Sequence, residues 1–311
     1  MSKVKTAVIG SGHLGKFHAR VLSELENSDF RYVVDIDEKT GREIAEKCGA
    51  DFVRDFREIA DKVDAVIIAT PTVLHYEIAK FFLENGVNVL VEKPITDRVE
   101  DGEKLITLAK EKGLKLQVGH IERFNPAFVS LKKNVKEVRF VKTSRLSPFT
   151  GRSVDIDVVL DLMIHDIDLV LTLVNSKPKR LTVKGSPVLT EKTDIGFALI
   201  EFENGAIAEL SVSRVSEERD RTVRVYDRDS YYSANLNNRT LKKVNYQGEK
   251  IKVEQVGVVN RDQLEAEDGA FLYSIINNIE VPVTGEDGVK ALELTKTISK
   301  MIEKREWFKE F

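Results

Sequence analysis

Asp161 and His165 stand four positions apart in a segment whose apolar residues recur at helical spacing. On an α-helix this spacing places both side chains on one face. A carboxylate beside an imidazole can act as a general base toward a hydroxyl proton, because the carboxylate stabilises the imidazolium that forms. Two other interpretations stay open: an ordinary salt bridge within the helix, and a pair of ligands for a divalent metal.

A glycine-rich segment near the start of the chain indicates nucleotide binding. Gly10-Ser11-Gly12-His13-Leu14-Gly15 follows a short apolar run and opens a helical pattern. Glycines in such a turn permit a tight bend, close approach of a pyrophosphate and close helix–strand packing. Asp35 stands about 20 residues after Gly15, where a carboxylate can hold the ribose hydroxyls of a dinucleotide. The alternative is an ordinary glycine-rich turn with Asp35 in a loop.

The residues around Asp35 bear on which nicotinamide dinucleotide binds. Asp35-Ile36-Asp37 offers two negative charges and an apolar side chain, whereas the 2′-phosphate of NADP requires cationic or hydroxyl donors. We therefore expect NAD rather than NADP, although Lys39 and Arg42 keep the question open. Asp37 is predicted to cap the following helix. Because the cofactor supplies the hydride acceptor, a metal in the second half of the chain is the weaker interpretation, and we expect none.

Polar residues also follow the later strands of the first 120 residues. In open α/β sheets ligands bind at the carboxyl ends of strands. Lys93 is the most suggestive, because the following proline forces an extended backbone and fixes the direction of the side chain; a solvated surface lysine is the alternative. For His75, packing within its helix is at least as good an interpretation. The residues at these strand ends are Thr70, Pro71, His75, Glu92, Lys93 and His120.

The elements that position these residues alternate along the first 120 residues. The run at 65–69 is continuously apolar, as in a parallel sheet that is covered on both faces. Asp97 is predicted to cap a helix, and Gly86 and Gly113 to end helices. The pattern predicts an α/β, doubly wound parallel sheet of the Rossmann type. Strands are expected at 6–10, 31–35, 65–70, 87–92 and 116–119, and helices at about 14–26, 38–48, 56–61, 73–85 and 97–112.

After residue 126 the rhythm changes. Several strands in succession favour an antiparallel sheet, so we expect an α+β domain with a large, open, mostly antiparallel sheet. The two expected domains are 1–121, which binds NAD, and 122–311, which binds substrate. The second comprises helices at 126–134, 157–174, 264–279 and 286–305, a strand at 136–144, a loop at 147–153, and strands between 180 and about 256.

The composition excludes several classes of protein. With 42% apolar residues the chain is not intrinsically disordered, and a net charge of −3 spread along it gives no footprint for nucleic acid. The single cysteine, Cys48, excludes a disulfide scaffold. No apolar run approaches the ~20 residues of a membrane span, and Met1–Lys5 leads directly into a strand pattern. We therefore expect a cytoplasmic protein without a signal peptide, a nucleic-acid partner or a membrane partner.

Together these motifs resemble the Gfo/Idh/MocA oxidoreductase family, which includes glucose–fructose oxidoreductase and inositol dehydrogenase. The resemblance covers nearly the whole chain, and Glu92-Lys93-Pro94 followed by Asp161-xxx-His165 is more specific than the glycines. It implies an NAD(P)-dependent dehydrogenase in which His165 takes the hydroxyl proton, Lys93 polarises the oxygen and Asp161 supports the base. It also implies a frequent cis Lys-Pro peptide, and an open sheet that serves in a homodimer or homotetramer.

The family resemblance also assigns the ligand contacts. Segments 118–126 and 161–168 resemble the members that oxidise the 3-hydroxyl of UDP-N-acetylglucosamine to a ketone. A diphosphate requires cations, although Arg145 and Arg152 have a solvated surface role as the alternative. His120 stands where many members carry an amide. The expected substrate contacts are Arg123, Asn125, Arg145 and Arg152, and the expected cofactor contacts are Gly10, Ser11, Gly12, His13, Leu14, Gly15, Asp35, Ile36, Thr70, Pro71, His75, Glu92, Lys93 and His120.

Two other functions compete with this interpretation. One is an inositol or free-sugar dehydrogenase of the same family, which would differ in the size and charge of its substrate site. The other is a non-catalytic NAD(P)-binding regulatory protein, which predicts the loss of Lys93 or His165. Both residues are present, and a sugar or nucleotide-sugar dehydrogenase is therefore preferred.

Overall fold

The computed structural model describes residues 3–151, 154–247 and 250–311 of the chain. Contacts divide it into two compact units: unit 1 comprises Met1–Ile121 and Asp262–Lys290, and unit 2 comprises Glu122–Arg261 and Ala291–Phe311. The contiguous domains expected from the sequence share the boundary at residue 121 but differ at 262–290. Those residues join unit 1 because Phe271, Leu272 and Val281 pack into its hydrophobic core.

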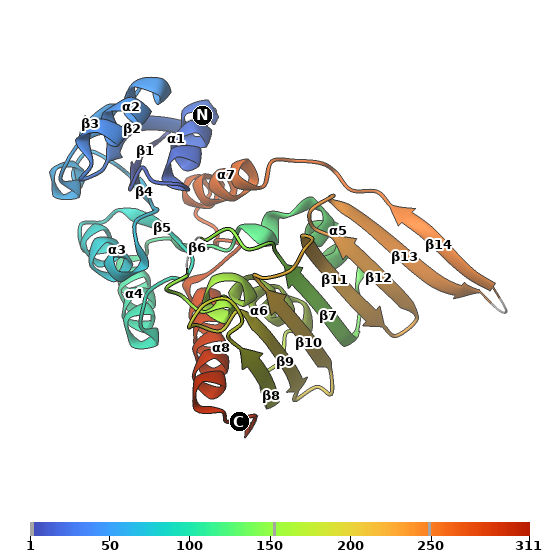
Figure 1. The fold of residues 1–311 in the computed structure, drawn as a ribbon. Helices are drawn as coiled ribbons and strands as arrows, with labels where there is room; N and C mark the ends of the chain where they lie inside the picture. The colour runs from blue at the N-terminus through green and yellow to red at the C-terminus, as the bar shows by residue number, and fades with distance from the viewer. Residues whose placement is uncertain (1–2, 152–153, 248–249) are drawn as a thin grey trace. The chain divides into compact units, whose positions relative to one another are not determined.

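Unit 1 is built on a parallel six-stranded sheet with the order β3-β2-β1-β4-β5-β6 (Figure 1). Every residue of the continuously apolar strand β4 is buried, as expected for a strand covered on both faces. The sequence patterns missed β3, which has three residues and no fully buried side chain. The strands are β1 (Val4–Ile9), β2 (Ser28–Val34), β3 (Asp51–Val53), β4 (Ala65–Ile68), β5 (Asn88–Glu92) and β6 (Leu116–Gly119).

Helices cover this sheet. Apolar residues of α1, α2 and α7 pack on Val8, Ile67 and Leu90, while α3 packs against α4. Asp37 caps α2 as predicted, and Gly113 ends α4 with a φ of +66°. The prediction for Asp97 was wrong: α4 begins one residue later than that cap requires, with Arg98 at the N-cap position. The helices are α1 (Gly15–Glu24), α2 (Glu38–Cys48), α3 (His75–Glu84), α4 (Val99–Lys112) and α7 (Gln263–Ile276).

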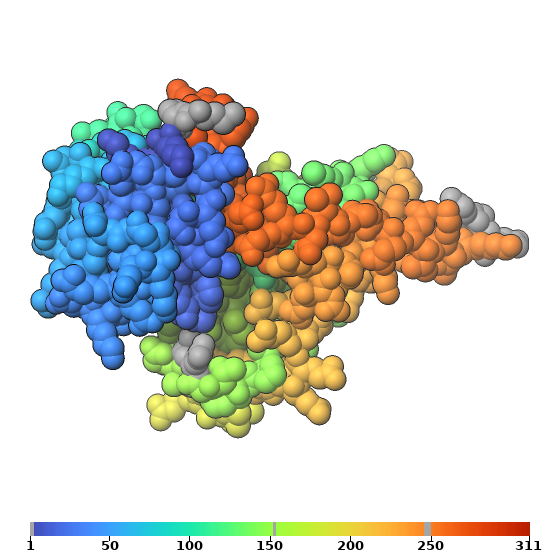
Figure 2. Space-filling view, turned by 90° about the horizontal axis from the view of Figure 1, so that it is seen from above, coloured from blue at the N-terminus to red at the C-terminus, as the bar shows by residue number. Residues whose placement is uncertain are grey.

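Unit 2 contains a large open sheet, with nine strands among the described residues, in the order β14-β13-β12-β11-β7-β10-β9-β8-β15. Neighbouring strands are antiparallel except β7 and β10, which are parallel. The outer strands β13 and β14 reach past α5 (Figure 2). The strands are β7 (Val138–Leu146), β8 (Pro178–Ser186), β9 (Ile195–Phe202), β10 (Ile207–Ser213), β11 (Asp220–Asp227), β12 (Ser230–Asn235), β13 (Thr240–Gln247), β14 (Lys250–Val256) and β15 (Phe308–Glu310).

One face of this sheet forms the core of unit 2. Burial alternates along β9, where Ala198, Ile200 and Phe202 are buried and the residues between them are partly exposed. The helices that cover the buried face are α5 (Pro126–Asn134), α6 (Ile164–Val174) and the second part of α8 (Gly285–Lys304). Among the described residues, no helix combines the length and the apolar character that crossing a bilayer requires.

Candidate functional site

The glycine turn of unit 1 is tightly packed on one side and open on the other. Gly10 has a φ of +92°, and a Cβ there would lie 2.8 Å from the carbonyl oxygen of Ala69. A Cβ on Gly15 would meet the carbonyl oxygen of Gly10 at 1.7 Å, so α1 begins in close contact with the turn. At Gly12, in contrast, nothing lies within 4 Å of an added Cβ. The turn is therefore closed toward the protein and open toward the side from which a ligand can approach the helix N-terminus.

Asp35 links the end of β2 to this turn. Its Oδ2 accepts hydrogen bonds from the main-chain N–H of Ser11 at 2.6 Å and from the Ser11 hydroxyl at 2.7 Å. Its Oδ1 accepts from the N–H of Asp37 at 2.9 Å. Ile36 is 82% exposed, and His13 and Leu14 are also exposed. The carboxylate thus lies beside the turn where the ribose of a dinucleotide is expected, and that contact stays a prediction.

His75 connects the ends of β4 and β5. Its Nε2 is 2.9 Å from the carbonyl oxygen of Thr70, and its Nδ1 is 2.9 Å from that of Pro94. The ring is 1% exposed, and burial lowers the pKa of His75. The ring therefore lies in the interior between two strand ends, which is the packing alternative weighed from the sequence.

Thr70 supplies a polar atom without a partner. Its buried hydroxyl makes no hydrogen bond to the described residues, and its methyl group lies 3.0 Å from an added Cβ on Gly10. An unsatisfied buried hydroxyl is costly unless a ligand or water completes it. Its place beside the glycine turn fits a dinucleotide. Pro71, the next residue, is exposed.

The Glu92-Lys93-Pro94 segment ends β5. The expected cis peptide is present between Lys93 and Pro94. Glu92 is 6% exposed, and its Oε2 accepts a hydrogen bond from the main-chain N–H of Lys93 at 3.2 Å. Lys93 itself is partly exposed, whereas His120, at the end of β6, is 1% exposed. The sheet thus brings Glu92, Lys93 and His120 to the carboxyl edge of two adjacent strands.

The carboxylate and imidazole of unit 2 lie on a helix of mixed type. Asp161 belongs to a π-helix, Val159–Met163, and His165 is the second residue of α6. The prediction of a single α-helix was therefore incomplete, but a π turn is wide enough to keep residues four apart close to one face. Asp161 and His165 are partly exposed, while residues 166–170 are buried. The exposed side of this helix is thus the side that carries the proposed base.

Asp157 fixes the start of that helix. Its Oδ1 accepts hydrogen bonds from the N–H groups of Val159 at 2.8 Å and Leu160 at 3.0 Å. Its Oδ2 accepts from the hydroxyl of Ser299 on α8 at 2.6 Å. The π-helix is therefore capped and tied to a second helix directly before Asp161.

Two of the three expected substrate arginines form ion pairs with buried carboxylates within unit 2. Arg145, on β7, is 1% exposed and donates to Asp166 at 3.0 Å and to Glu122 at 3.0 Å. Arg123 grips Asp168 through its Nε at 2.8 Å and keeps 11% of its side chain exposed. Arg145 is therefore not the solvated surface residue of the alternative interpretation: it joins α6 to β7, and its contact with a substrate stays a prediction.

The remaining substrate contacts are distributed differently. Asn125 is 1% exposed, caps α5 through the N–H of Ala127 and donates to the carbonyl oxygen of Leu236 at 3.1 Å. Its carboxamide thus serves the interior of unit 2. Arg152 lies outside the described residues. Direct contact with a substrate stays a prediction for each of these positions.

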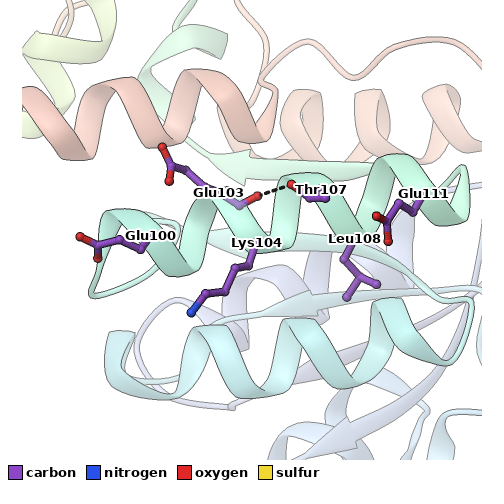
Figure 3. Close-up of a pocket in the computed structure, with 6 residues that line it drawn as sticks. All are labelled: Glu100, Glu103, Lys104, Thr107, Leu108 and Glu111. Atoms are coloured by element: carbon purple, nitrogen blue, oxygen red, sulfur yellow. Dashed lines mark hydrogen bonds between the residues drawn. The ribbon is translucent and has the colours of Figure 1, made fainter.

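A surface hollow on α4 is unrelated to the predicted site. Three glutamates line it, and the hydroxyl of Thr107 donates to the carbonyl oxygen of Glu103 at 3.0 Å (Figure 3). No residue that the sequence marked for chemistry takes part. The lining residues are Glu100, Glu103, Lys104, Thr107, Leu108 and Glu111.

Sequence reasoning missed His18, which is buried between two carboxylates of unit 1. Its Nδ1 lies 3.0 Å from both oxygens of Asp268, and its Nε2 lies 2.9 Å from Oε1 of Glu92. Its position on α1, three residues after Gly15, carried no motif. Asp268 lies 250 residues downstream, so the pattern of the sequence gave no sign of this contact.

Comparison with known proteins agrees with this geometry. The model of an oxidoreductase family with an NAD-binding Rossmann fold matches residues 4–120, and that of the Gfo/Idh/MocA C-terminal domain matches 142–229. UDP-N-acetylglucosamine 3-dehydrogenase of Acidithiobacillus ferrooxidans is 35% identical over 94% of this chain and 95% of its own. Its solved structure has a TM-score of 0.93, with 98% of this chain and 99% of that one covered.

A second relative is more distant. Myo-inositol 2-dehydrogenase of Thermotoga maritima is 25% identical over 97% of both chains. The match to the Acidithiobacillus protein exceeds this one in identity at similar coverage. The chain belongs to the Gfo/Idh/MocA family of oxidoreductases, and its N-terminal part is the NAD-binding Rossmann domain of that family.

Proposed function

We propose that the protein oxidises the 3-hydroxyl of UDP-N-acetylglucosamine to a ketone, with NAD as the hydride acceptor. The observation that carries the proposal is the 35% identity to a UDP-N-acetylglucosamine 3-dehydrogenase over 94% of the chain. A myo-inositol 2-dehydrogenase that matches over 97% of the chain is only 25% identical. A nucleotide sugar is therefore preferred to inositol or a free sugar.

We assign cofactor binding to unit 1. The open side of Gly12 and the N-terminus of α1 suit a pyrophosphate, and the Thr70 hydroxyl offers a buried donor beside it. Asp35 suits the ribose hydroxyls, and its negative charge with the exposed Ile36 favours NAD over NADP. When bound, the nicotinamide supplies the acceptor for the hydride.

We assign proton transfer to His165 and Asp161, and stabilisation of the developing charge to Lys93. His165 accepts the proton of the sugar hydroxyl, and Asp161 stabilises the resulting imidazolium; a base of this kind contributes about 10²–10⁴ in rate. The ammonium group of Lys93 stabilises the negative charge that develops on the same oxygen. The contacts around Lys93 in unit 1 and around α6 in unit 2 support these roles, because each motif is fixed by buried partners.

Arg123 is our candidate for the diphosphate of the substrate. Its side chain keeps 11% of its surface exposed, against 1% for Arg145. Bidentate contact with Asp168 orients the guanidinium without removing it from the surface. Replacing Arg123 with alanine should therefore raise the KM for a nucleotide sugar more than the KM for NAD.

The direct test is a spectrophotometric assay with purified protein. UDP-N-acetylglucosamine and NAD together should produce the absorbance band of reduced nicotinamide, and NADP should produce less. UDP-glucose and myo-inositol serve as matched controls for the acetamido group and for the nucleotide. Activity with inositol, and none with the nucleotide sugar, would reverse the preference between the two substrates. Binding of NAD with no turnover of any sugar would favour the non-catalytic alternative.

We also propose a homodimer or homotetramer. Phe140, Tyr226 and Tyr231 pair across β7, β11 and β12 on the face opposite the core, and Tyr226 is 45% exposed. An aromatic row of this kind suits an interface. Light scattering of the purified chain tests this oligomeric state, and a monomer at micromolar concentration would contradict it.

A cytoplasmic location stays a prediction.

A further inference from the structure

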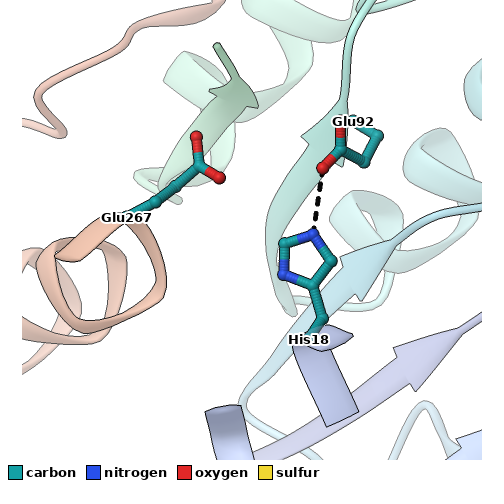
Figure 4. Close-up of side chains that lie close together, drawn as sticks. All are labelled: His18, Glu92 and Glu267. Carbon is teal, nitrogen blue, oxygen red and sulfur yellow. Dashed lines mark hydrogen bonds and ion pairs between the residues drawn. The ribbon is translucent and has the colours of Figure 1, made fainter. Parts of the chain in front are cut away.

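A buried chain of contacts links helices α1 and α7 to the Lys93 segment. His18 and Asp268 are fully buried, and Glu92 is 6% exposed. Figure 4 shows the His18 ring directed at the Glu92 carboxylate, with Glu267 nearby on α7. All of these residues belong to unit 1. None of these residues has a catalytic role in the proposal above. Glu92 is connected to that proposal only because it accepts a hydrogen bond from the main-chain N–H of Lys93.

The contacts define the protonation state of His18. Both ring nitrogens lie 2.9–3.0 Å from carboxylate oxygens, which accept hydrogen bonds and cannot donate them when ionised. The ring can donate to Asp268 and Glu92 together only as an imidazolium. Burial by itself lowers the pKa of His18, but the charges and hydrogen bonds of Asp268 and Glu92 outweigh burial and hold the pKa well above its ordinary value.

The second oxygen of Glu92 connects this cluster to the main chain of Lys93. Oε1 faces His18, while Oε2 accepts a hydrogen bond from the main-chain N–H of Lys93 at 3.2 Å. Gly119 of β6 packs against the same group, because an added Cβ there would lie 3.0 Å from the Glu92 carboxyl carbon. The carboxylate therefore has one position, in which one oxygen is held by the ring and the other holds the backbone of Lys93.

We propose that His18 is a positioning residue for Lys93, which it fixes through the carboxylate of Glu92. The proposal rests on the catalytic role of Lys93 proposed above. Lys93 shares its main chain with the hydrogen bond that Glu92 accepts, so a shift of the carboxylate shifts the amine. Displacements of about 1 Å cost about 10²-fold in rate when they affect a reacting group.

A metal ion is the competing occupant of this cluster. One ligand atom each from His18, Glu92 and Glu267 lies within 4.8 Å of the others. A metal, however, requires a ring nitrogen with a free lone pair, whereas both nitrogens of His18 face carboxylates at hydrogen-bond distance. The geometry thus favours the imidazolium.

The test compares His18→Gln with Thr6→Val. Thr6 is also buried in unit 1 and pairs with Ser28 through their hydroxyls at 2.8 Å; it lies level with the start of β5, at the opposite end of that strand from Lys93. His18→Gln should lower kcat by about 10–100-fold with little change in the Kd for NAD. NMR should show exchange of the Lys93 amide accelerating roughly tenfold more than exchange of the amides of β1, which report the stability of unit 1. Thr6→Val should change neither kcat nor the Lys93 amide.

Each result decides the proposal. An unchanged Lys93 amide in His18→Gln overturns it, as does an equal loss of kcat in Thr6→Val. If His18→Gln does not fold, Asp268→Asn replaces it, since an amide oxygen still accepts a hydrogen bond from Nδ1–H. Smaller changes of kcat and of Lys93 amide exchange, in the same direction, would then support the proposal. The absence of any change in Asp268→Asn would overturn it. If the native enzyme oxidises no sugar, the catalytic assignment fails while amide exchange still tests the positioning by itself.

Discussion

Each unit holds one of its motifs with a buried cation between carboxylates, but the two cations differ. In unit 1 the imidazole of His18 lies between Asp268 and Glu92, next to Lys93. In unit 2 the cation is the guanidinium of Arg145, which is 1% exposed. The first cluster supports a strand end and the second supports a helix.

The guanidinium cluster fixes the orientation of α6. Arg145 joins Asp166 on this helix to Glu122, and Arg123 holds Asp168 two positions further on. The anchoring residues Asp166 and Asp168 are buried, whereas His165, which directly precedes them in the sequence, keeps part of its surface exposed. A guanidinium keeps its proton at every pH that a protein tolerates, whereas an imidazole does not. The two units therefore use the same device with different sensitivity to pH.

The largest expected effect is on turnover. His165→Ala should lower kcat by about 10²–10⁴-fold because it removes the base, while the Kd for NAD stays unchanged. Steady-state kinetics and calorimetric titration with NAD measure the two quantities. Thr172→Val on the same helix is the control, because the buried Thr172 hydroxyl makes no hydrogen bond to the described residues. Unchanged turnover in His165→Ala would remove it as the base.

The next effect concerns the stability of unit 2. Arg145→Met should lower the free energy of unfolding by about 3–5 kcal/mol, because it leaves buried carboxylates without their cation. Urea unfolding followed by circular dichroism measures it. Adding Glu122→Gln and Asp166→Asn to the same chain should recover part of the loss. If the single variant is as stable as the native protein, the cluster does not hold α6.

A smaller effect separates the two clusters by pH. The folded-state pKa of His18 is raised, so its contribution to stability is complete below about pH 6.5, the ordinary value, and is lost as pH rises through the raised pKa. The pKa of His75 is lowered by burial, so the contribution of this residue to stability is complete above about pH 6.5 and is lost as pH falls through the lowered pKa. As pH rises into the alkaline range, amide exchange in β1 should therefore accelerate more than amide exchange in β9. Both rates are first corrected for the intrinsic pH dependence of amide exchange. His18→Gln should abolish this difference.

The smallest expected effect is that of a chelator. EDTA should leave turnover and thermal stability unchanged, because both nitrogens of His18 are engaged by carboxylates. Activity before and after chelation, with and without added zinc, measures it. Inhibition that zinc reverses would make His18, Glu92 and Glu267 a metal site and would end the comparison between two ionic clusters.

Local patterns in the sequence predicted most elements of unit 1. Apolar runs, helix caps and the glycine turn are properties of neighbouring residues, and they gave five of the six strands and the cap at Asp37. They could not give the π turn at 159–163, because the apolar spacing of these residues is also that of an ordinary α-helix. Nor could they place α7 in unit 1, because that depends on contacts across the whole chain.

The candidate site divides in the same way. Lys93, Asp161 and His165 were found from motifs, and the comparisons show the family to which those motifs belong. The partners that hold the motifs were not found. His18 meets Asp268 across 250 residues, and an arginine such as Arg145 looks alike in sequence whether it binds substrate or lies in the interior.

The return of α7 to unit 1 has a consequence for synthesis on the ribosome. Asp268 is translated about 150 residues after Gly119, the end of the last strand of the parallel sheet, so at ~5–20 residues per second it follows on the order of ten seconds later. During that interval the nascent imidazole of His18 has Glu92 as its anion and lacks the second. The first unit to emerge is thus completed late, and strands β7–β14 of unit 2 must leave the tunnel before it can close.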